Sequence, residues 1–140
     1  MRSFRIYIDE NLPVQLAKGL NILQEPQNKK DDFTIEVVSI TEKFGKGAKD
    51  EDWIPEVGKE GGIVITQDYR IQTQKHQREL YRQHGVGILF INPPSKSGFS
   101  YWEMVKKVVN EWEDVKVILR KEKTPFAFRC TAKTKFAKFE

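Results

Sequence analysis

Two short apolar runs of this chain each lead directly to a carboxylate. The run Gly62-Ile-Val-Ile-Thr66 precedes Asp68, and the run Phe4-Arg-Ile-Tyr-Ile8 precedes Asp9. Continuous apolar runs of this length are typical of strands that are buried on both faces of a sheet. In open α/β folds, ligands bind beyond the carboxyl ends of parallel strands. We therefore expect Asp9 and Asp68 to lie on one edge of a parallel sheet.

A third carboxylate, Asp50, stands at the start of an expected helix and is a further candidate for this edge. Asp9 and Asp68 would repel each other on one rim unless a cation were bound between them. Hard divalent cations such as Mg²⁺ take oxygen ligands, so a few convergent carboxylates are enough to hold one. The nearby oxygen donors are Glu10, Asn11, Glu51, Asp52 and Thr66. For Asp50 and Asp52, a helix-capping role is a strong alternative.

Apolar periodicity predicts strands that alternate with helices. Strands are expected over residues 4–8, 34–40, 63–66, 86–91 and 115–119, with a last edge strand over 125–130 and fraying from Lys133. Helices are expected from the Asn11 region to about Leu23, from Asp50, over residues 70–83, and around a core stripe of Trp102, Val105, Val108, Val109 and Trp112. Residues 24–32, 41–49 and 92–98 are expected to be loops. This alternation predicts a three-layer α/β/α fold with a central, mainly parallel sheet of about five strands.

The composition is that of one globular domain spanning residues 1–140. The chain is 39% hydrophobic and 31% charged, and no apolar stretch approaches the ~20 residues of a membrane span. With one cysteine, Cys130, it has neither an intramolecular disulfide nor a cysteine zinc site. No signal-peptide pattern precedes the first strand, so a cytoplasmic protein with no membrane partner is expected.

Positive charge is concentrated in a basic C-terminal tail that begins at about residue 121. Lys133, Lys135 and Lys138 alternate there with phenylalanines, and the net charge of the whole chain is +4. Such a segment suits a polyanion such as RNA. It equally suits a solvated edge strand that lysines protect from aggregation. Both interpretations stay open at this point.

Three acidic segments carry a resemblance to a known family. They are Ile8-Asp9-Glu10-Asn11-Leu12-Pro13, Gly47-Ala48-Lys49-Asp50-Glu51-Asp52-Trp53-Ile54 and Val64-Ile65-Thr66-Gln67-Asp68-Tyr69-Arg70-Ile71. In this order and strand context, the chain resembles the PIN-like nuclease superfamily. It is most similar to the compact toxin-like branch of virulence-associated protein C ribonucleases, which the tail Pro125-Phe-Ala-Phe-Arg129 also resembles.

The resemblance implies a ribonuclease that depends on Mg²⁺ or Mn²⁺ and acts as the toxin of a toxin–antitoxin pair. Asp9, Asp50 and Asp68 would be the metal ligands, with Glu51 or Asp52 as a fourth acid. Thr66 would support the site and Arg70 would hold a phosphate. The partners would be RNA and a protein antitoxin, and a homodimer is one possible assembly. In the helix after Arg70, the only carboxylate is Glu79.

Two other function classes remain as alternatives. A phosphoryl-receiver signalling domain also has an acidic pair, here Asp9 and Glu10, after its first strand, and an aspartate, here Asp68, after a later one. Against it, Arg120 rather than the expected lysine follows residues 115–119 directly. The other alternative is a catalytically inactive PIN-like module that binds RNA or a protein partner.

Overall fold

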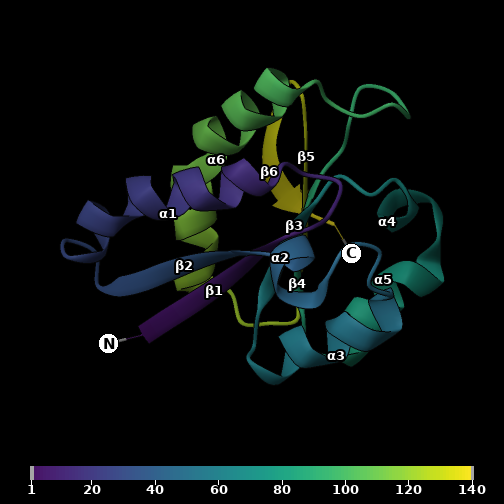
Figure 1. Cartoon of the computed structure of the whole chain (residues 1–140), viewed down its shortest axis with the longest axis horizontal. Helices are drawn as coiled ribbons and strands as arrows, with labels where there is room; N and C mark the ends of the chain where they lie inside the picture. The colour runs from purple at the N-terminus through teal and green to yellow at the C-terminus, as the bar shows by residue number, and fades with distance from the viewer. Residues whose placement is uncertain (1, 140) are drawn as a thin grey trace.

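Six strands form a single sheet in the computed structural model, which describes residues 2–139 (Figure 1). The strands are β1 (Arg2–Ile8), β2 (Phe33–Ser39), β3 (Ile63–Thr66), β4 (Gly87–Ile91), β5 (Ala127–Thr131) and β6 (Thr134–Lys138). The helices are α1 (Val14–Asn28), α2 (Ile40–Phe44), α3 (Asp50–Lys59), α4 (Arg70–Thr73), α5 (Lys75–Gln83) and α6 (Tyr101–Lys121).

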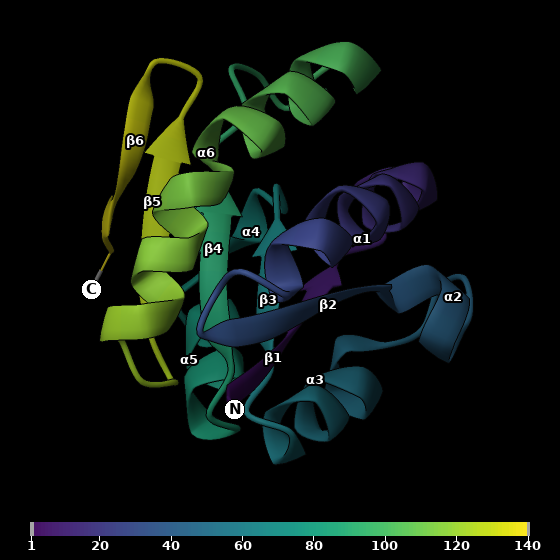
Figure 2. The same cartoon turned by 90° about the vertical axis from the view of Figure 1, so that its left-hand side faces the viewer.

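The strand order is β2-β1-β3-β4-β5-β6, and only β6 is antiparallel to its neighbour. Helices α1 and α6 cover one face of the sheet, and α3 and α5 lie against the other (Figure 1, Figure 2). The predicted three-layer α/β fold with a mainly parallel sheet is therefore confirmed, with six strands where about five were expected.

Two hydrophobic cores, one on each face, hold the layers together. Ile6, Ile63 and Leu89 belong to the core under α1 and α6. Tyr7 and Val64 belong to the core under α3 and α5. Neighbouring strand residues point to opposite faces, so strands with a core on each side must be apolar throughout. All four residues of β3 are buried, as its sequence predicts.

The strand predicted over residues 115–119 is wrong, because these residues form the last turns of α6. A Ser100–Glu103 capping box begins this helix, and Met104, Val108 and Val115 are buried along one side of it. The helical spacing continues through the apolar run, so helix packing overrides its β propensity. The predicted core stripe is right only in part: Val108 is buried, but Trp102 is 74% exposed and Val109 45%.

Residues 133 onward do not fray as predicted. They form β6, which pairs antiparallel with β5, so β6 rather than the segment predicted over 125–130 is the sheet edge. Lys107 Nζ of α6 donates to the Thr134 carbonyl oxygen at 2.9 Å and helps to hold this hairpin.

The first helix runs past Leu23, where it was expected to end, and Gln24 is buried rather than in an exposed loop. Gln24 accepts a hydrogen bond from Trp112 Nε1 (2.9 Å) and donates to Asp31 Oδ2 (3.2 Å). These tertiary bonds stabilise a polar helix end that the sequence pattern alone favours as a loop. The expected loop over 41–49 also contains α2, capped by Ser39. The helix expected over 70–83 is divided at Gln74 into α4 and α5.

Two asparagines of α1 cover the outer edge of the sheet at β2. Asn21 donates to the Val37 carbonyl (2.6 Å) and accepts from the Val37 N–H (2.8 Å). Asn28 pairs in the same way with both backbone groups of Ile35, at 3.4 and 3.0 Å. Side-chain amides thus pair with backbone groups that an edge strand would otherwise leave open.

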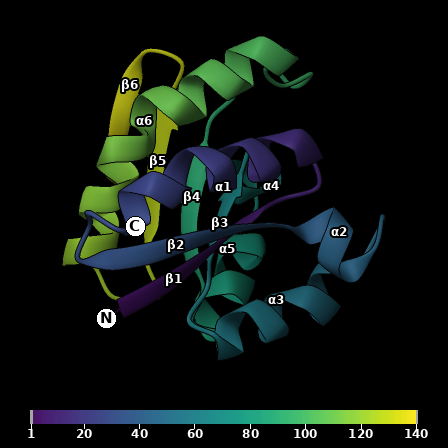
Figure 3. The ribbon, with the colours of Figure 1, turned by 60° about the vertical axis from the view of Figure 1, so that its left-hand side comes forward.

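Helices α1 and α6 lie side by side on one face of the sheet (Figure 3). Between them is a groove lined by Gln15, Leu16, Gly19, Leu20, Leu23, Tyr101, Trp102, Val105 and Val109. No charged residue lines it, and Leu23 and Trp102 are largely exposed. Among the helices of residues 2–139, none is long and apolar enough to cross a membrane.

Candidate active site

Asp9 lies directly after β1 and is only 7% exposed. Its Oδ2 atom accepts a 2.7 Å hydrogen bond from the Thr66 hydroxyl, and its Oδ1 atom accepts one of 2.8 Å from the Glu10 N–H. Its own N–H donates to the Ile65 carbonyl oxygen, which continues the pairing of β1 with β3. The neighbouring ends of two parallel strands therefore fix this carboxylate in one orientation.

Thr66 connects Asp9 to Asp68. The fully buried Thr66 hydroxyl donates to Asp9 and accepts the Asp68 N–H at 2.9 Å. A hydroxyl has one proton and two lone pairs, so it can serve both contacts at once. The Thr66 hydroxyl therefore contacts the side chain of Asp9 and the backbone of Asp68, which are two of the candidate ligands.

Asp50 and Asp68 are joined by the guanidinium group of Arg70. Arg70 Nη2 lies 2.6 Å from Asp68 Oδ2 and 3.1 Å from Asp50 Oδ2, and Arg70 Nε also donates to both Asp68 oxygens. These hydrogen bonds, foremost those with Asp68, raise the pKa of Arg70. Asp50 comes from the first residue of α3 and Asp68 from the loop before α4. One cation therefore balances two carboxylates that come from separate elements.

Burial raises the pKa of Asp9 to about 6, against the opposing effects of its hydrogen bonds with Thr66 and the Glu10 backbone. The negative charges of Asp68 and Asp50 raise it further. These two carboxylates are therefore close enough to Asp9 to act on its charge. Tyr81 packs against Trp53, and its burial raises its pKa. The negative charges of the same three aspartates raise the pKa of Tyr81 further.

Of the remaining predicted residues, Glu10, Asn11, Glu51 and Asp52 border the site, whereas the three lysines lie on a separate hairpin. Glu10 Oε2 accepts the Gly47 N–H at 3.1 Å, and Asn11 contributes its backbone carbonyl to Gln67 Nε2 at 2.8 Å. Glu51 and Asp52 are exposed on the first turn of α3, and within residues 2–139 their side chains have no hydrogen-bond or ion-pair partner. Lys133, Lys135 and Lys138 lie on the β5–β6 hairpin, where Lys138 pairs with Glu122 at 3.4 Å.

Two glutamines complete the site and were not predicted. Gln77, 4% exposed, donates to Asp50 Oδ2 at 2.7 Å from α5. Gln67 joins the segment after β1 to the loop before α6, because it also accepts the Phe99 N–H. Gln77 is one of three glutamines between Arg70 and Glu79, and this polar stretch was the only sequence signal for it; Gln67 had none. Glu79, the one acid of that segment, instead lines a separate pocket with Arg82.

The oxygen donors suit a hard divalent cation in their chemistry, since they are three carboxylates and a hydroxyl. Asp9 in particular is a buried carboxylate without a cationic partner among residues 2–139. In this arrangement, however, no three Asp, Glu, His or Cys side chains of the described residues form a group that could hold a metal ion. Arg70 occupies the oxygen atoms of Asp50 and Asp68 instead.

The protein is therefore of the α/β class, and it carries an acidic site beyond the carboxyl ends of β1 and β3. The family model described as PIN like domain matches residues 4–93, which include Asp9, Asp50 and Asp68. The chain therefore belongs to the PIN-like domain family, whose members are typically nucleases. Comparisons with curated proteins and with solved structures find no match.

Proposed function

We propose that this protein is a metal-dependent endoribonuclease and the toxin of a toxin–antitoxin pair. The observation that carries the proposal is the chain of contacts that links Asp9, Asp68 and Asp50 through Thr66 and Arg70 in a PIN-like domain. Their mutual repulsion favours a bound cation at this edge. Because the chain belongs to the PIN-like family, we do not propose the alternative of a phosphoryl-receiver domain.

In this proposal, Asp9, Asp50 and Asp68 hold Mg²⁺ or Mn²⁺. Such a cation polarises a phosphodiester and lowers the pKa of a bound water. Asp9 is oriented in advance by the Thr66 hydroxyl and the Glu10 N–H, so one ligand is fixed before the cation binds. Gln77 orients Asp50 by its 2.7 Å hydrogen bond. Glu51 and Asp52, exposed on the same helix turn, are candidates for a fourth acid.

Arg70 has a second role in the proposal. A cation on Asp50 and Asp68 must compete with Arg70 for the same Oδ2 atoms. The Arg70 side chain is 50% exposed, so it has room to leave them. Guanidinium groups bind phosphate well, and a released Arg70 would hold the RNA backbone next to the cation. Arg70 then balances the acids before substrate binds and contacts the substrate afterwards.

Cleavage of RNA by the purified protein tests the proposal. We expect products when Mg²⁺ or Mn²⁺ is present, no products in excess EDTA, and a loss of at least about 100-fold for Asp68→Asn or Asp50→Asn. Glu25→Gln, on the exposed side of α1, is the matched control and should cut like wild type. Equal cleavage in EDTA would contradict the metal-dependent mechanism.

A protein antitoxin is the proposed neutralising partner. The uncharged groove between α1 and α6 supports a protein partner, since contiguous exposed apolar surface marks interaction sites. Expression should arrest the growth of a host cell, and Asp9→Asn should abolish the arrest. Harmless expression of enzyme that is active in vitro would count against a toxin. Self-association through this groove, as a homodimer, is a separate outcome that the mass in solution would report.

The pairing of Arg70 with two of the three acids favours one second candidate, a PIN-like module that binds RNA without cutting it. If Arg70 holds Asp50 and Asp68 permanently, the cation has no site. Arg70→Ala separates the two candidates. It should increase the thermal stabilisation by Mn²⁺ in an enzyme whose arginine competes with the metal, and should leave metal binding absent in an inactive module.

A further inference from the structure

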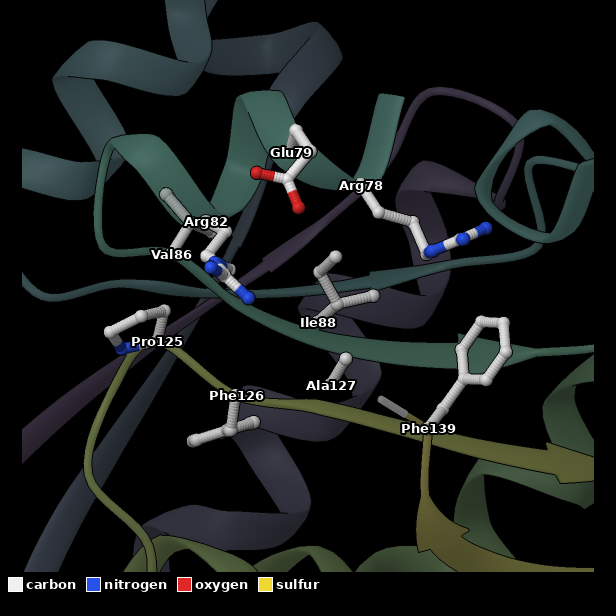
Figure 4. Close-up of a pocket in the computed structure, with 9 residues that line it drawn as sticks. All are labelled: Arg78, Glu79, Arg82, Val86, Ile88, Pro125, Phe126, Ala127 and Phe139. Atoms are coloured by element: carbon white, nitrogen blue, oxygen red, sulfur yellow. The ribbon is translucent and has the colours of Figure 1, made fainter. Parts of the chain in front are cut away.

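A pocket of about 300 Å³ opens on the α5 side of the sheet, away from the groove between α1 and α6 (Figure 4). Its residues are Arg78, Glu79, Arg82, Val86, Ile88, Pro125, Phe126, Ala127 and Phe139. The side chains of Ile88 and Ala127 form its floor, α5 forms one wall, and Pro125 and Phe139 stand toward its two ends (Figure 4). A flat apolar floor beneath a charged wall suits a planar ligand that also carries charge.

The arginines around this pocket belong to a cationic surface. The guanidinium groups of Arg78 and Arg129 lie 5.3 and 4.8 Å from the centre of the Phe139 ring, which holds both in place. Arg82 is exposed and has no ion-pair partner within residues 2–139. An anion at this pocket would therefore meet the arginines of the α5 wall, foremost the exposed Arg82.

This cationic surface continues to the candidate active site through α4. Arg78 Nη1 donates to the Ile71 carbonyl at 2.9 Å, and Arg129 Nη1 donates to Gln72 Oε1 at 3.3 Å. Helix α4 begins at Arg70, which contacts Asp50 and Asp68, and its four residues span only ~6 Å. A chain molecule that reaches the carboxylates can therefore also reach the pocket.

We propose that this pocket receives a base of the RNA strand that is cut at Asp9, Asp50 and Asp68. The proposal rests on the ribonuclease function and names a subsite of the same substrate. The base lies on Ile88 and Ala127, and its flanking phosphate contacts Arg82. Glu79 on the same wall repels phosphate, and its carboxylate accepts hydrogen bonds from N–H groups at the edge of a base. Glu79 therefore favours an orientation with the base inside the pocket and the phosphate outside.

The chemistry of the pocket favours a nucleic acid over a protein segment as the occupant. Each nucleotide supplies one planar ring and one negative charge, and the pocket supplies one apolar floor and a cationic rim. Proteins that bind single strands combine a basic track with surfaces for base stacking in the same way. A protein segment would need its acidic and apolar side chains in one fixed arrangement, and its binding is an outcome that the experiment below distinguishes.

Binding of a short single-stranded RNA, measured by fluorescence anisotropy in EDTA, tests the proposal without requiring cleavage. Replacing the nucleotides one at a time by an abasic residue should weaken binding at one position by roughly 5- to 150-fold. Ala127→Leu fills the floor, so it should weaken binding of the unmodified RNA and remove the sensitivity to that abasic position. The loss of this coupling identifies the pocket as the base site.

Arg82→Ala provides an independent test, because an exposed arginine can be removed without disturbing the fold. It should weaken binding and lower the slope of log affinity against log salt by about one. Lys106→Ala, an exposed cation on the opposite face, is the matched control and should change neither. Melting temperatures should show that Ala127→Leu is folded.

Each result decides the question. A flat abasic profile in wild type, or wild-type RNA affinity in Ala127→Leu and Arg82→Ala, would overturn the proposal. If the pocket variants bind RNA normally and cleave it, the pocket inference fails and the ribonuclease function stands. If wild type shows the abasic signature but never cleaves RNA, the enzyme proposal fails and the base site remains. Loss of a protein partner with unchanged RNA binding would assign the pocket to that partner.

Discussion

At the scale of single residues, Asp9 differs from the other candidate ligands in its surroundings. Asp50 and Asp68 are paired with Arg70, whereas Asp9 accepts only neutral hydrogen bonds from Thr66 and Glu10. A buried carboxylate without a cation is costly in the folded state, and the pKa of about 6 reflects that cost. The fold therefore carries an electrostatic penalty at this position that a bound metal would remove.

Replacing Asp9 by Asn should stabilise the metal-free protein, because it removes the buried charge while the amide oxygen still accepts the Glu10 N–H and the amide NH2 donates to the Thr66 hydroxyl. We expect a gain of about 1–3 kcal/mol at neutral pH, since each pKa unit corresponds to about 1.4 kcal/mol. Thermal melts in EDTA and in excess Mn²⁺ measure it. Metal should reverse the order, because wild type keeps a ligand that the variant has lost.

Glu25→Gln is the control for this measurement, because it removes an exposed carboxylate from α1. It should move the free energy of unfolding by no more than about 0.5 kcal/mol in either condition. A loss of stability for Asp9→Asn in EDTA, together with melts of wild type that ignore metal, would make Asp9 a structural residue only.

At the scale of the elements, a buried ion pair fastens α6 to the turn between α1 and β2. Lys116 Nζ lies 2.9 Å from Asp31 Oδ2, and their side chains are 3% and 11% exposed. Burial by itself would raise the pKa of Asp31, but the hydrogen bonds from Lys116 and Gln24 hold it below its ordinary value. Lys116 lies within the run that was predicted as a strand, and this contact helps to keep the run helical.

Asp31→Asn should therefore destabilise the fold by about 3 kcal/mol at neutral pH, because it leaves the buried Lys116 without its main partner. A carboxyl with a lowered pKa contributes its stability above the unfolded pKa of about 4, and that contribution is lost as the pH falls through the lower folded value. The advantage of wild type over Asp31→Asn should thus shrink below about pH 4. Chemical denaturation at several pH values measures it.

Asp32→Asn is the neighbouring control, since Asp32 is 71% exposed and meets Arg120 at 3.6 Å. Exposed pairs contribute only about 0–1 kcal/mol, so this variant should remain close to wild type at every pH. Equal losses for both variants would show that the Lys116 pair has no special role.

The elements that the sequence predicts correctly are those with a local signal. The apolar run of β3 and the acidic first turn of α3 each suffice to identify their element. The run from Val115 to Leu119 is equally apolar, but its state depends on Met104 and Val108 in earlier turns and on contacts with α1 and β2. Strand β6 was missed because its lysines and exposure conceal a pairing that only β5 defines.

The same division applies to the candidate site. The positions of Asp9, Thr66 and Asp68 could be predicted, because each lies at or just beyond the end of a strand and parallel strands end at one edge. The bridge of Arg70 to Asp50 and the contact of Gln77 could not be predicted, because they join α3, α4 and α5. No local pattern determines how these three short helices pack together.

At the scale of the whole molecule, both outer strands of the sheet are protected in different ways. Strand β6 carries Lys135 and Lys138, and charged side chains discourage edge pairing. At β2, the amides of Asn21 and Asn28 pair with the backbone of Val37 and Ile35. Edge protection by Lys135 and Lys138 is therefore one of the two interpretations of the basic tail, and contact with RNA is the other.

Replacing Asn21 and Asn28 together by Ala should open the β2 edge. Two N–H and two C=O groups of Ile35 and Val37 lose their partners, and each unpaired group costs about 1–3 kcal/mol where water does not reach it. We expect a lower melting temperature and faster aggregation by light scattering. Asn110→Ala, on the exposed side of α6, is the matched control. Unchanged aggregation would show that α1 shields the strand by bulk alone.

The asparagine pairs at β2 also restrict how other proteins can recognise this one. A ligand that adds a strand to a sheet binds through backbone atoms, which are the same in every sequence, so these hydrogen bonds supply affinity rather than specificity. With Ile35 and Val37 already paired, that route is closed at β2, and a partner that binds at this edge must instead recognise the side chains of α1. Related chains that share this edge could therefore each acquire a dedicated partner, and a cell could hold several such pairs without cross-talk.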